Sequence, residues 1–379
     1  MERNVPKLRF KGFNDEWNEL KVSDTLKIRH GKDQKKIECE NGEYPILATG
    51  GEIGRTDTPI YDKESVLIGR KGTIDRPIYM NTPFWTVDTL FYSEIHNNYI
   101  PKFIYYKFQC INWKKYCEAS GVPSLSASTI ESIKYKLPSL QEQERIANFL
   151  TKVDKIIEKQ EEKVKNLEKY KKGMMQKIFS QEIRFKDEDG EEYPEWEDKK
   201  IVDIFIEINE KTSIKNQYEV LSSTSTGLFK QSEYFNREIA SEDNTGYKIL
   251  RKKQIVLSPQ NLWLGNINYN NKYETGIVSP SYKIFNVAEN TLPQFVAYII
   301  KLDRMLYEYK QASEQGASVV RRNLNMDLFN DIVIKLPCYR EQSRITAYLN
   351  NIDVILEKEK SKLEELKIWK KGLLQQMFV

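Results

Sequence analysis

One helical segment occurs twice in this chain, and no other feature restricts its fold as strongly. Residues 137–179 and 336–378 align without a gap, so that each position in the first copy has its counterpart 199 positions later. A period near 200 residues excludes a solenoid, whose repeats are roughly 20–50 residues long, and indicates a tandem duplication. The residues of the first copy that recur identically include Leu137, Pro138, Glu142, Gln143, Arg145, Ile146, Leu150, Asp154, Lys172, Gly173 and Phe179.

A weaker repeat precedes each helical segment. Residues 8–10, followed by Trp17 and Asp24, correspond to residues 183–185 followed by Trp196 and Asp203, and both copies contain Arg-Phe. Between these landmarks, residues 25–120 and 204–312 share little. The duplicated frame therefore carries two divergent inserts.

Both repeated segments are predicted to be long helices, because they lack internal proline and are rich in Glu, Lys, Leu and Ile. A 3–4 spacing gives each a coiled-coil seam, with polar residues at equivalent places: Gln160 with Glu359 and Lys171 with Lys370. The seam is compatible with pairing between two chains, but the gap-free duplication favours an antiparallel pair within one chain. The inserts would then lie near the ends of a rod of roughly 58 Å, which compares with about 34–36 Å for one turn of DNA.

Each insert reads as short strands punctuated by Gly, Asn and Pro, followed by an aromatic-rich helix at 102–120 or 294–313. We therefore expect an α+β fold: two mixed α/β recognition domains separated by two long antiparallel helices that form a coiled coil, with a pseudo-two-fold internal repeat. The expected boundaries are 1–140 for the first domain, 141–180 for the first spacer helix, 181–339 for the second domain and 340–379 for the second spacer helix.

Several loops combine small polar and basic residues, the types that hydrogen-bond base edges and phosphates. Surface loops often have this composition, so the pattern alone indicates DNA only weakly. Interleaved aromatic residues (Tyr61, Trp85, Trp263 and Tyr269) are expected to pack in the cores rather than stack on bases. The candidate DNA contacts are Lys35, Lys36, Thr49, Arg55, Arg70, Lys71, Thr73, Ser124, Ser126, Ser222, Ser223, Thr224, Asn261, Asn266, Ser281, Arg321, Arg322 and Asn323.

The sequence offers no catalytic constellation. Only two histidines are present, and the four cysteines show no metal-ligand spacing. The Ser258–Asn261 loop lacks the second proline and the aromatic residue of an amino-methyltransferase motif, and the acidic run 187–192 reads as a solvated turn rather than a calcium loop. We expect no metal, no cofactor bound by this chain, no membrane span and a cytoplasmic location with reduced thiols. The net charge of +4 requires any DNA-binding cations to gather on one face.

With these motifs the chain resembles the specificity subunit of type I restriction–modification enzymes. The resemblance rests on the paired LPxxxEQxxI…L…D segments, the RF…W…D openings, and YPILATGG with GRKGTI in the first insert. Family members commonly have a second proline after LP, where this chain has Ser139 and Cys338.

The resemblance implies that each insert reads one half of a bipartite, asymmetric target in double-stranded DNA, while the helices set the gap and dock two methyltransferase subunits. Those subunits bind S-adenosylmethionine and methylate adenine, and two separate motor–nuclease subunits use ATP and Mg²⁺ to cut unmethylated DNA. This chain would have no active site of its own. The residues expected in the spacer and in subunit docking are Glu142, Gln143, Ile146, Leu150, Asp154, Glu341, Gln342, Ile345, Leu349 and Asp353.

Two other interpretations remain at this stage. A helical scaffold or inhibitor could bind a methyltransferase without reading DNA, and sequence-selective DNA binding with that partner would separate the two. A solitary enzyme is disfavoured by the missing motifs, and methyl transfer by the purified chain alone would revive it.

Overall fold

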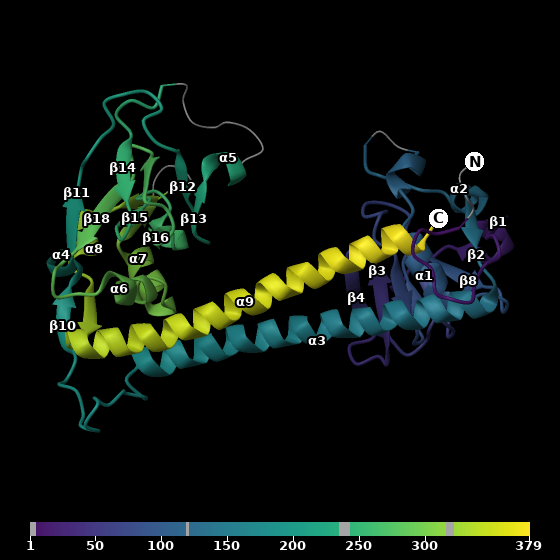
Figure 1. Ribbon diagram of the computed structural model, residues 1–379, viewed down its shortest axis with the longest axis horizontal. Helices are drawn as coiled ribbons and strands as arrows, with labels where there is room; N and C mark the ends of the chain where they lie inside the picture. The colour runs from purple at the N-terminus through teal and green to yellow at the C-terminus, as the bar shows by residue number, and fades with distance from the viewer. Residues whose placement is uncertain (1–4, 119–120, 235–242, 316–321) are drawn as a thin grey trace. The chain divides into compact units, whose positions relative to one another are not determined.

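The computed structural model describes residues 5–118, 121–234, 243–315 and 322–379 (Figure 1). The chain forms two compact units. Unit 1 comprises Met1–Lys165 with Lys358–Val379, and unit 2 comprises Asn166–Glu357. The helices α3 (Leu140–Phe179) and α9 (Tyr339–Met377) each contribute to both units, so neither helix is a domain in itself.

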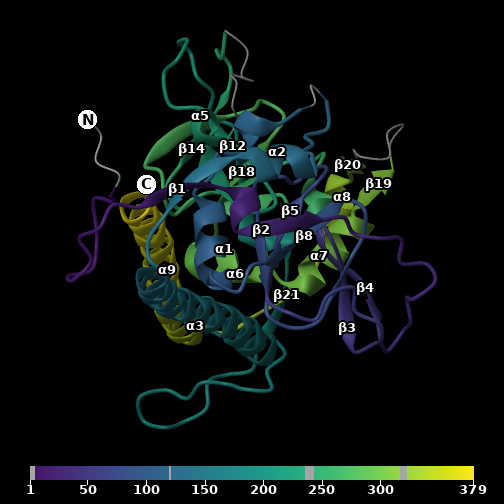
Figure 2. The same cartoon turned by 90° about the vertical axis from the view of Figure 1, so that its right-hand side faces the viewer.

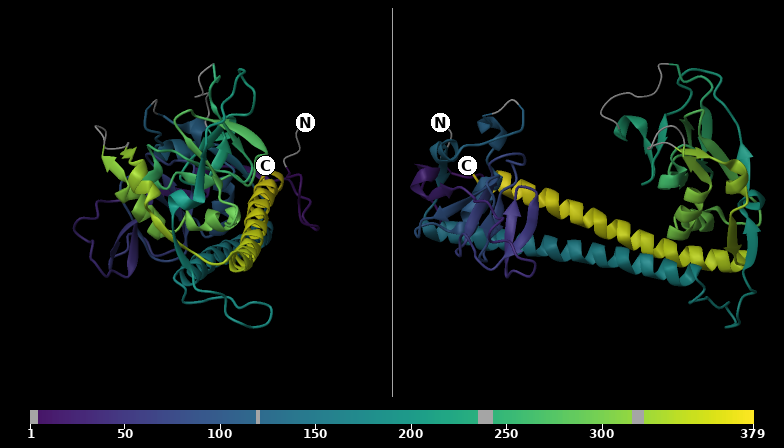
Figure 3. Two further views of the ribbon diagram at one scale, coloured as in Figure 1. Left: turned by 90° about the vertical axis from the view of Figure 1, so that its left-hand side faces the viewer. Right: turned by 180° about the vertical axis from the view of Figure 1, so that it is seen from behind.

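The two long helices pack on each other along the predicted seam, as Figure 3 shows. Within unit 1, Asp154 of α3 pairs with Lys370 of α9 and Gln160 with Glu359, so the helices run antiparallel there. Within unit 2, Lys171 pairs with Asp353 in the same sense. Most apolar side chains of the seam are buried, as expected for the apolar stripe of a packed helix. Those with the least exposure are Ile146, Leu150, Val153, Ile178, Ile345, Leu349 and Met377.

Unit 1 is built on an antiparallel sheet in the order β2-β8-β5-β6. All five residues of β5, Ser-Val-Leu-Ile-Gly, are buried, which suits the inside of a sheet. A second sheet, β4-β3-β7, and the pair β1–β9 complete the unit. The strands are β1 (Asn18–Lys21), β2 (Leu26–Arg29), β3 (Tyr44–Ala48), β4 (Gly51–Thr56), β5 (Ser65–Gly69), β6 (Ile78–Met80), β7 (Trp85–Thr86), β8 (Leu90–Ile95) and β9 (Lys134–Leu137).

Unit 2 repeats the plan with the order β11-β18-β15-β16 and the pair β10–β21. The shared sheet order was not visible in the sequence, because it depends on which short strands pair rather than on residue identity. The strands are β10 (Glu197–Lys200), β11 (Phe205–Ile208), β12 (Leu221–Ser223), β13 (Leu228–Lys230), β14 (Lys248–Arg251), β15 (Ile255–Leu257), β16 (Ile267–Tyr269), β17 (Thr275–Val278), β18 (Lys283–Val287), β19 (Ser313–Gln315), β20 (Arg322–Leu324) and β21 (Val333–Leu336).

The prediction of one continuous aromatic-rich helix in each insert is wrong, because the helical segment is interrupted in both units. In unit 2 the first helix ends at Ile299, and Leu302, whose backbone is extended (ψ 145°), is the N-cap of the next helix, which begins at Asp303. The other helices are α1 (Pro101–Gln109), η2 (Trp113–Tyr116), α6 (Pro293–Ile299), α7 (Asp303–Gln311), η1 (Val22–Asp24), α2 (Ala127–Ser132), α4 (Ile201–Ile204), α5 (Gln231–Tyr234), η3 (Leu262–Leu264) and α8 (Met326–Asn330).

Candidate nucleic-acid interface and the contacts that support it

The glutamate of each EQ motif binds the arginine of the preceding Arg-Phe. In unit 1, Glu142 is 1% exposed, and its two oxygens accept hydrogen bonds of 2.7 Å and 2.7 Å from Arg9. In unit 2, Glu341 is 0% exposed and accepts from Arg184 at 3.0 Å and from the Trp196 indole at 3.0 Å. A buried carboxylate needs such partners to offset its desolvation. The repeated Arg-Phe and EQ motifs are therefore two halves of one ion pair.

The glutamine of each EQ motif fixes the start of the insert's aromatic helix. Gln143 accepts from the backbone N–H of Ile100, which precedes α1, at 3.3 Å, and donates to the Pro138 carbonyl at 3.0 Å. Gln342 accepts from the N–H of Leu292, which precedes α6, at 2.8 Å, and donates to the Pro337 carbonyl at 2.9 Å. The amide thus satisfies backbone groups that a helix start leaves open.

A tyrosine, an aspartate and a lysine form the third repeated contact. In unit 1, the Tyr106 hydroxyl of α1 donates to Asp154 at 2.7 Å, and Lys370 pairs with the same carboxylate at 2.7 Å. Figure 2 shows α1 beside α3. Burial, together with the bond to Asp154, raises the pKa of Tyr106 far above its usual range, so the hydroxyl remains a donor.

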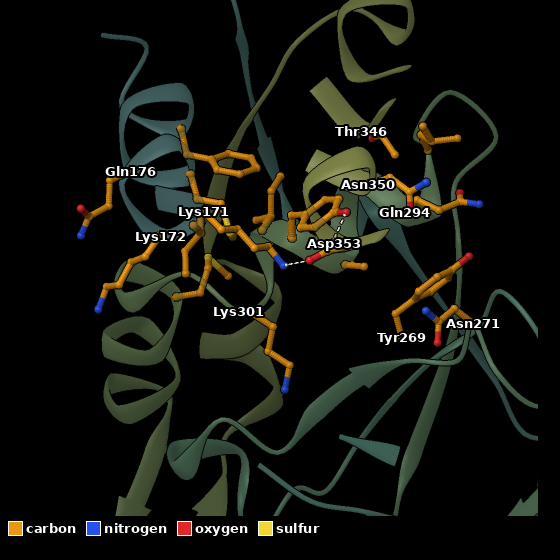
Figure 4. Close-up of a pocket in the computed structure, with 18 of the residues that line it drawn as sticks. Lys171, Lys172, Gln176, Tyr269, Asn271, Gln294, Lys301, Thr346, Asn350 and Asp353 are labelled. Atoms are coloured by element: carbon orange, nitrogen blue, oxygen red, sulfur yellow. Dashed lines mark hydrogen bonds and ion pairs between the residues drawn. The ribbon is translucent and has the colours of Figure 1, made fainter. Parts of the chain in front are cut away.

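Unit 2 has the same contact. Tyr298 of α6 donates to Asp353 at 2.8 Å, and Lys171 pairs with that carboxylate (Figure 4). We call the Arg–Glu, Gln and Tyr–Asp–Lys interactions together the frame contacts.

The frame contacts change the interpretation of the residues predicted for subunit docking. The side chains of that set are buried or half-buried, and they bind partners within their own unit. The direct docking role is therefore wrong for the eight that are 0–2% exposed, because a subunit approaching from outside cannot reach them: Glu142, Gln143, Ile146, Leu150, Glu341, Gln342, Ile345 and Leu349. Their role in holding the helices is internal.

Two loops predicted to bind DNA in unit 1 meet after β5. The N–H of Gly72 donates to the Pro123 carbonyl at 2.9 Å, the N–H of Leu125 donates to the Arg70 carbonyl at 2.9 Å, and Lys71 forms a bridge with Ser124. Gly72 has φ +84°, and a Cβ there would lie 3.8 Å from Thr49 Oγ1. The structure thus gathers Thr49, Arg70, Lys71, Thr73 and Ser124, and Ser126 follows as the N-cap of α2.

The remaining candidates of unit 1 do not join this cluster as free side chains. Arg55 is occupied by the carbonyls of Gly42 and Glu43, each at 2.7 Å. Lys35 and Lys36 lie in a separate exposed turn. Arg70 pairs with Asp88, whereas Lys71 is exposed in the same loop.

The equivalent place in unit 2 is the loop from Ser258 to Asn266, which follows β15. The N–H of Arg322, the first residue of β20, donates to the Gln260 carbonyl at 3.3 Å, and its guanidinium lies 4.7 Å from the centre of the Trp263 ring. Asn261 is half-buried in this loop, and Asn323 is exposed on β20. Trp263, which was expected in the core, is instead half-buried beneath an arginine. Arg321 lies outside the described residues.

Three unit 2 candidates are wrong as DNA contacts, because they are buried in a polar network between β12 and β16. Ser223 is 4% exposed and donates to Asn266 at 2.6 Å, while Asn266, 5% exposed, donates to the Ser223 carbonyl at 2.8 Å. Ser222 is buried beside them. Thr224 accepts from Thr226 within a turn, and the exposed Ser281 hydrogen-bonds to Ser279.

Lys301 supports the unit 2 loop and was not anticipated from the sequence. It follows α6 and donates to the carbonyls of Gly265 at 3.1 Å and Ser225 at 3.3 Å. Desolvation of its ammonium lowers the pKa of Lys301 to about 8. Nothing in its local sequence distinguishes it, because both of its acceptors are backbone carbonyls of distant loops.

Unit 2 also contains a cavity of about 1460 Å³ between the long helices and the insert (Figure 4). Lys171, Lys172, Gln294, Asn350 and Asp353 are among the residues that line it, so both signs of charge are present. Its lysines at 171 and 172 pair with Asp353 and Asp303. These two lysines therefore have carboxylate partners within the wall itself.

Among the described residues, no cluster of three or more His, Cys, Asp or Glu side chains could hold a metal ion. The acidic run is a turn in which the Asp187 carboxylate accepts from the N–H groups of Asp189 and Glu191, as predicted. No helix of the described chain is long and apolar enough to span a membrane.

Comparison with known sequences gives one family and several relatives. Residues 14–169 match the family described as Type I restriction modification DNA specificity domain. The type I restriction enzyme MjaVIII specificity subunit of Methanocaldococcus jannaschii is 24% identical over 420 residues, covering 97% of this chain and 93% of that protein. The putative type I restriction enzyme MjaX specificity subunit of the same organism is 26% identical over 265 residues, covering 64% of this chain and 59% of that protein.

Two solved structures share the fold. The S subunit of a type I restriction–modification system from M. genitalium superposes with a TM-score of 0.62 at 17% identity, covering 99% of both chains. A chain from a structure of complex assembly and conformational transition in the type I R-M system gives a TM-score of 0.53 at 12% identity, covering 97% of this chain and 99% of that one.

Proposed function

Because the chain is a relative of type I restriction–modification specificity subunits and carries their DNA specificity domain over residues 14–169, we propose that it is the DNA sequence-recognition subunit of such a complex. In this proposal each unit reads one half of a bipartite, asymmetric target. Specificity subunits are generally non-catalytic. S-adenosylmethionine would be held by methyltransferase subunits, and ATP with Mg²⁺ by motor–nuclease subunits.

The observation that carries the proposal is the recurrence of one loop pairing in both units. The loop that follows the inner strand of the sheet, β5 or β15, is hydrogen-bonded to the segment that leads into a short helix, α2 or α8. The frame contacts are the same in the two units, whereas Lys71 and Ser124 in one are replaced by Gln260 and Arg322 in the other. A constant frame with different loop chemistry supports two readers of different sequences.

Docking of two methyltransferase subunits on the helices is supported by apolar side chains that the frame leaves exposed. Ile368 and Trp369 of α9, in unit 1, are 69% and 45% exposed. Val354 and Ile355 of the same helix, in unit 2, are 61% and 49% exposed. Contiguous exposed apolar patches often mark interaction surfaces, and these exposed side chains are the candidates for such a patch. They replace the buried EQ residues as the proposed docking contacts.

The test is to express the chain with a methyltransferase partner and map the methylated adenines. We expect a two-part motif with a fixed gap. Replacing residues 25–135 by the insert of another specificity subunit is expected to change one half of the motif and leave the other intact. If both halves change, or if the unaltered complex methylates without sequence preference, the proposal is wrong.

A second experiment addresses the helices. Inserting four residues near Gln160, about one helical turn, is expected to lengthen the gap while both half-sites remain the same. An unchanged gap would contradict the role of the helices as a spacer.

A further inference from the structure

Arg322 differs from the other arginines of the candidate interface in what its guanidinium contacts. Arg55 donates to backbone carbonyls and Arg70 pairs with Asp88, so each of these guanidinium groups already has an acceptor. Among the described residues, no carboxylate pairs with Arg322, whose guanidinium carbon lies 4.7 Å from the centre of the Trp263 ring. Stacking over an aromatic face attracts the cation through its flat side and leaves the in-plane N–H groups available.

The platform beneath Arg322 is rigidly held. Trp263 lies in η3 between the buried Leu262 and Gly265, whose left-handed conformation (φ 83°) ends the turn. Lys301 donates to the Gly265 carbonyl at 3.1 Å, and the N–H of Ser258 donates to the Asn266 carbonyl at 3.0 Å, which closes the loop. The backbone of the loop that carries the ring is therefore fixed.

The backbone of Arg322 is fixed as well. Its N–H donates to Gln260 at 3.3 Å, and β20 pairs with β19 so that Asn323 lies opposite Glu314. An arginine fixed at its backbone and at its guanidinium loses little rotamer freedom when it binds. Such preorganisation increases the fraction of interaction energy that appears as affinity.

We propose that Arg322, stacked on Trp263, reads a guanine in the half-site bound by unit 2. The in-plane fork of a guanidinium matches the O6 and N7 acceptors of guanine in the major groove, and this bidentate pair is the commonest specific contact of arginine with DNA. Lysine cannot reproduce the fork, because its ammonium is a point charge. The inference rests on the proposed function and assigns one base class to one residue.

The test is selection from a randomised duplex library by the complex assembled with its methyltransferase partner. With Arg322→Lys, we expect discrimination at one guanine position of one half-site to fall by about 5- to 150-fold, while the other half-site is unchanged. Trp263→Leu is expected to weaken the same position, and Trp263→Phe to retain most of the discrimination because a flat face remains. Circular dichroism melts of each variant establish that unit 2 is folded.

A matched control is Arg251→Lys, which changes an exposed arginine of unit 2 that pairs with Glu210 away from this loop. It is expected to leave every position of the motif unchanged. If Arg322→Lys weakens all sequences equally, Arg322 contacts a phosphate and the inference is wrong. An unchanged motif with Arg322→Lys also overturns it, whereas the absence of any motif with the unaltered complex overturns the proposed function itself.

Discussion

Gln160 donates a hydrogen bond of 2.7 Å to the carboxylate of Glu359, the residue that occupies the same position in the second copy of the repeat. A residue meets its own counterpart only where two equal antiparallel helices cross at matched positions. The Lys163 ammonium also pairs with the Glu359 carboxylate, at 2.7 Å. A polar pair in an apolar seam fixes register, because sliding by one turn would leave these groups without partners.

This pair predicts a pH dependence of stability. The hydrogen bond from Gln160, followed by that from Lys163, lowers the pKa of Glu359. A carboxyl whose pKa is lower in the folded state stabilises the protein above its unfolded pKa, and that contribution is lost as the pH falls through the folded pKa. We expect Glu359→Gln to melt below the unaltered protein at pH 7 and to converge with it as the pH falls toward 3. Glu162→Gln, at an exposed position of α3, should show no such convergence.

Breaking the buried ion pair of unit 1 is expected to be costly. Glu142→Ala leaves Arg9, which is 14% exposed, without its carboxylate and should lower the free energy of unfolding by about 3 kcal/mol. Glu144→Ala, at an exposed position on the same helical turn, should change it by less than about 0.5 kcal/mol. Urea denaturation measures both, and equal effects would contradict the assigned role of Glu142.

The two tyrosine contacts allow a paired test of the repeat. Tyr106→Phe and Tyr298→Phe each remove one hydroxyl that donates to a carboxylate, and each should cost about 1–2 kcal/mol. Because the two sites lie in different units, the double variant should show the sum of the single effects. If the double variant departs strongly from the sum in urea denaturation, the two tyrosine contacts do not stabilise their units independently.

Cys110 is predicted to react slowly with thiol reagents, although its residue is exposed. Its sulfur donates to the carbonyl of Tyr106 at 3.3 Å, and burial of the thiol raises its pKa to about 11. The thiolate is the reactive form, so the rate should rise about tenfold per pH unit between pH 8 and 10. A variant with serine at positions 39, 117 and 338 leaves Cys110 as the one thiol to be measured. A reaction rate that levels off near pH 9 would contradict the raised pKa of Cys110.

The exposed apolar pair in unit 2 predicts where a methyltransferase binds. Ile355→Asp replaces a 49% exposed apolar side chain by a charge and should weaken association about tenfold or more, measured by calorimetry. Asn351→Asp adds the same charge at another exposed position of α9 and serves as the control. Equal binding by Ile355→Asp and the unaltered chain would place the docking surface elsewhere.

The helices and their seam could be predicted because their periodicity extends over about forty residues, with Val153 and Leu349 at the expected spacing. The loop after β5 was also identified as a candidate interface. The sheet order was not predictable, since a three-residue strand such as β15 carries no pairing information by itself.

Burial of polar side chains limited the prediction of site residues. Ser223 and Asn266 are of the types that read bases, but the same hydroxyl and amide groups satisfy each other inside unit 2. Glu142 looked like a surface contact because its partner, Arg9, is 133 positions away along the chain. The role of such residues depends on long-range contacts that a local pattern does not contain.

Unit 1 draws on both ends of the sequence, whereas unit 2 is one continuous stretch. During synthesis on the ribosome, unit 2 can therefore be completed before unit 1. In the folded protein the ring centre of Phe378 lies 6.2 Å from that of Trp17 and 5.3 Å from that of Phe103, and Phe378 is synthesised long after both. Until Phe378 emerges, Trp17 and Phe103 lack its ring as a packing partner, and a nascent chain halted before residue 358 would expose an apolar surface to chaperones or proteases.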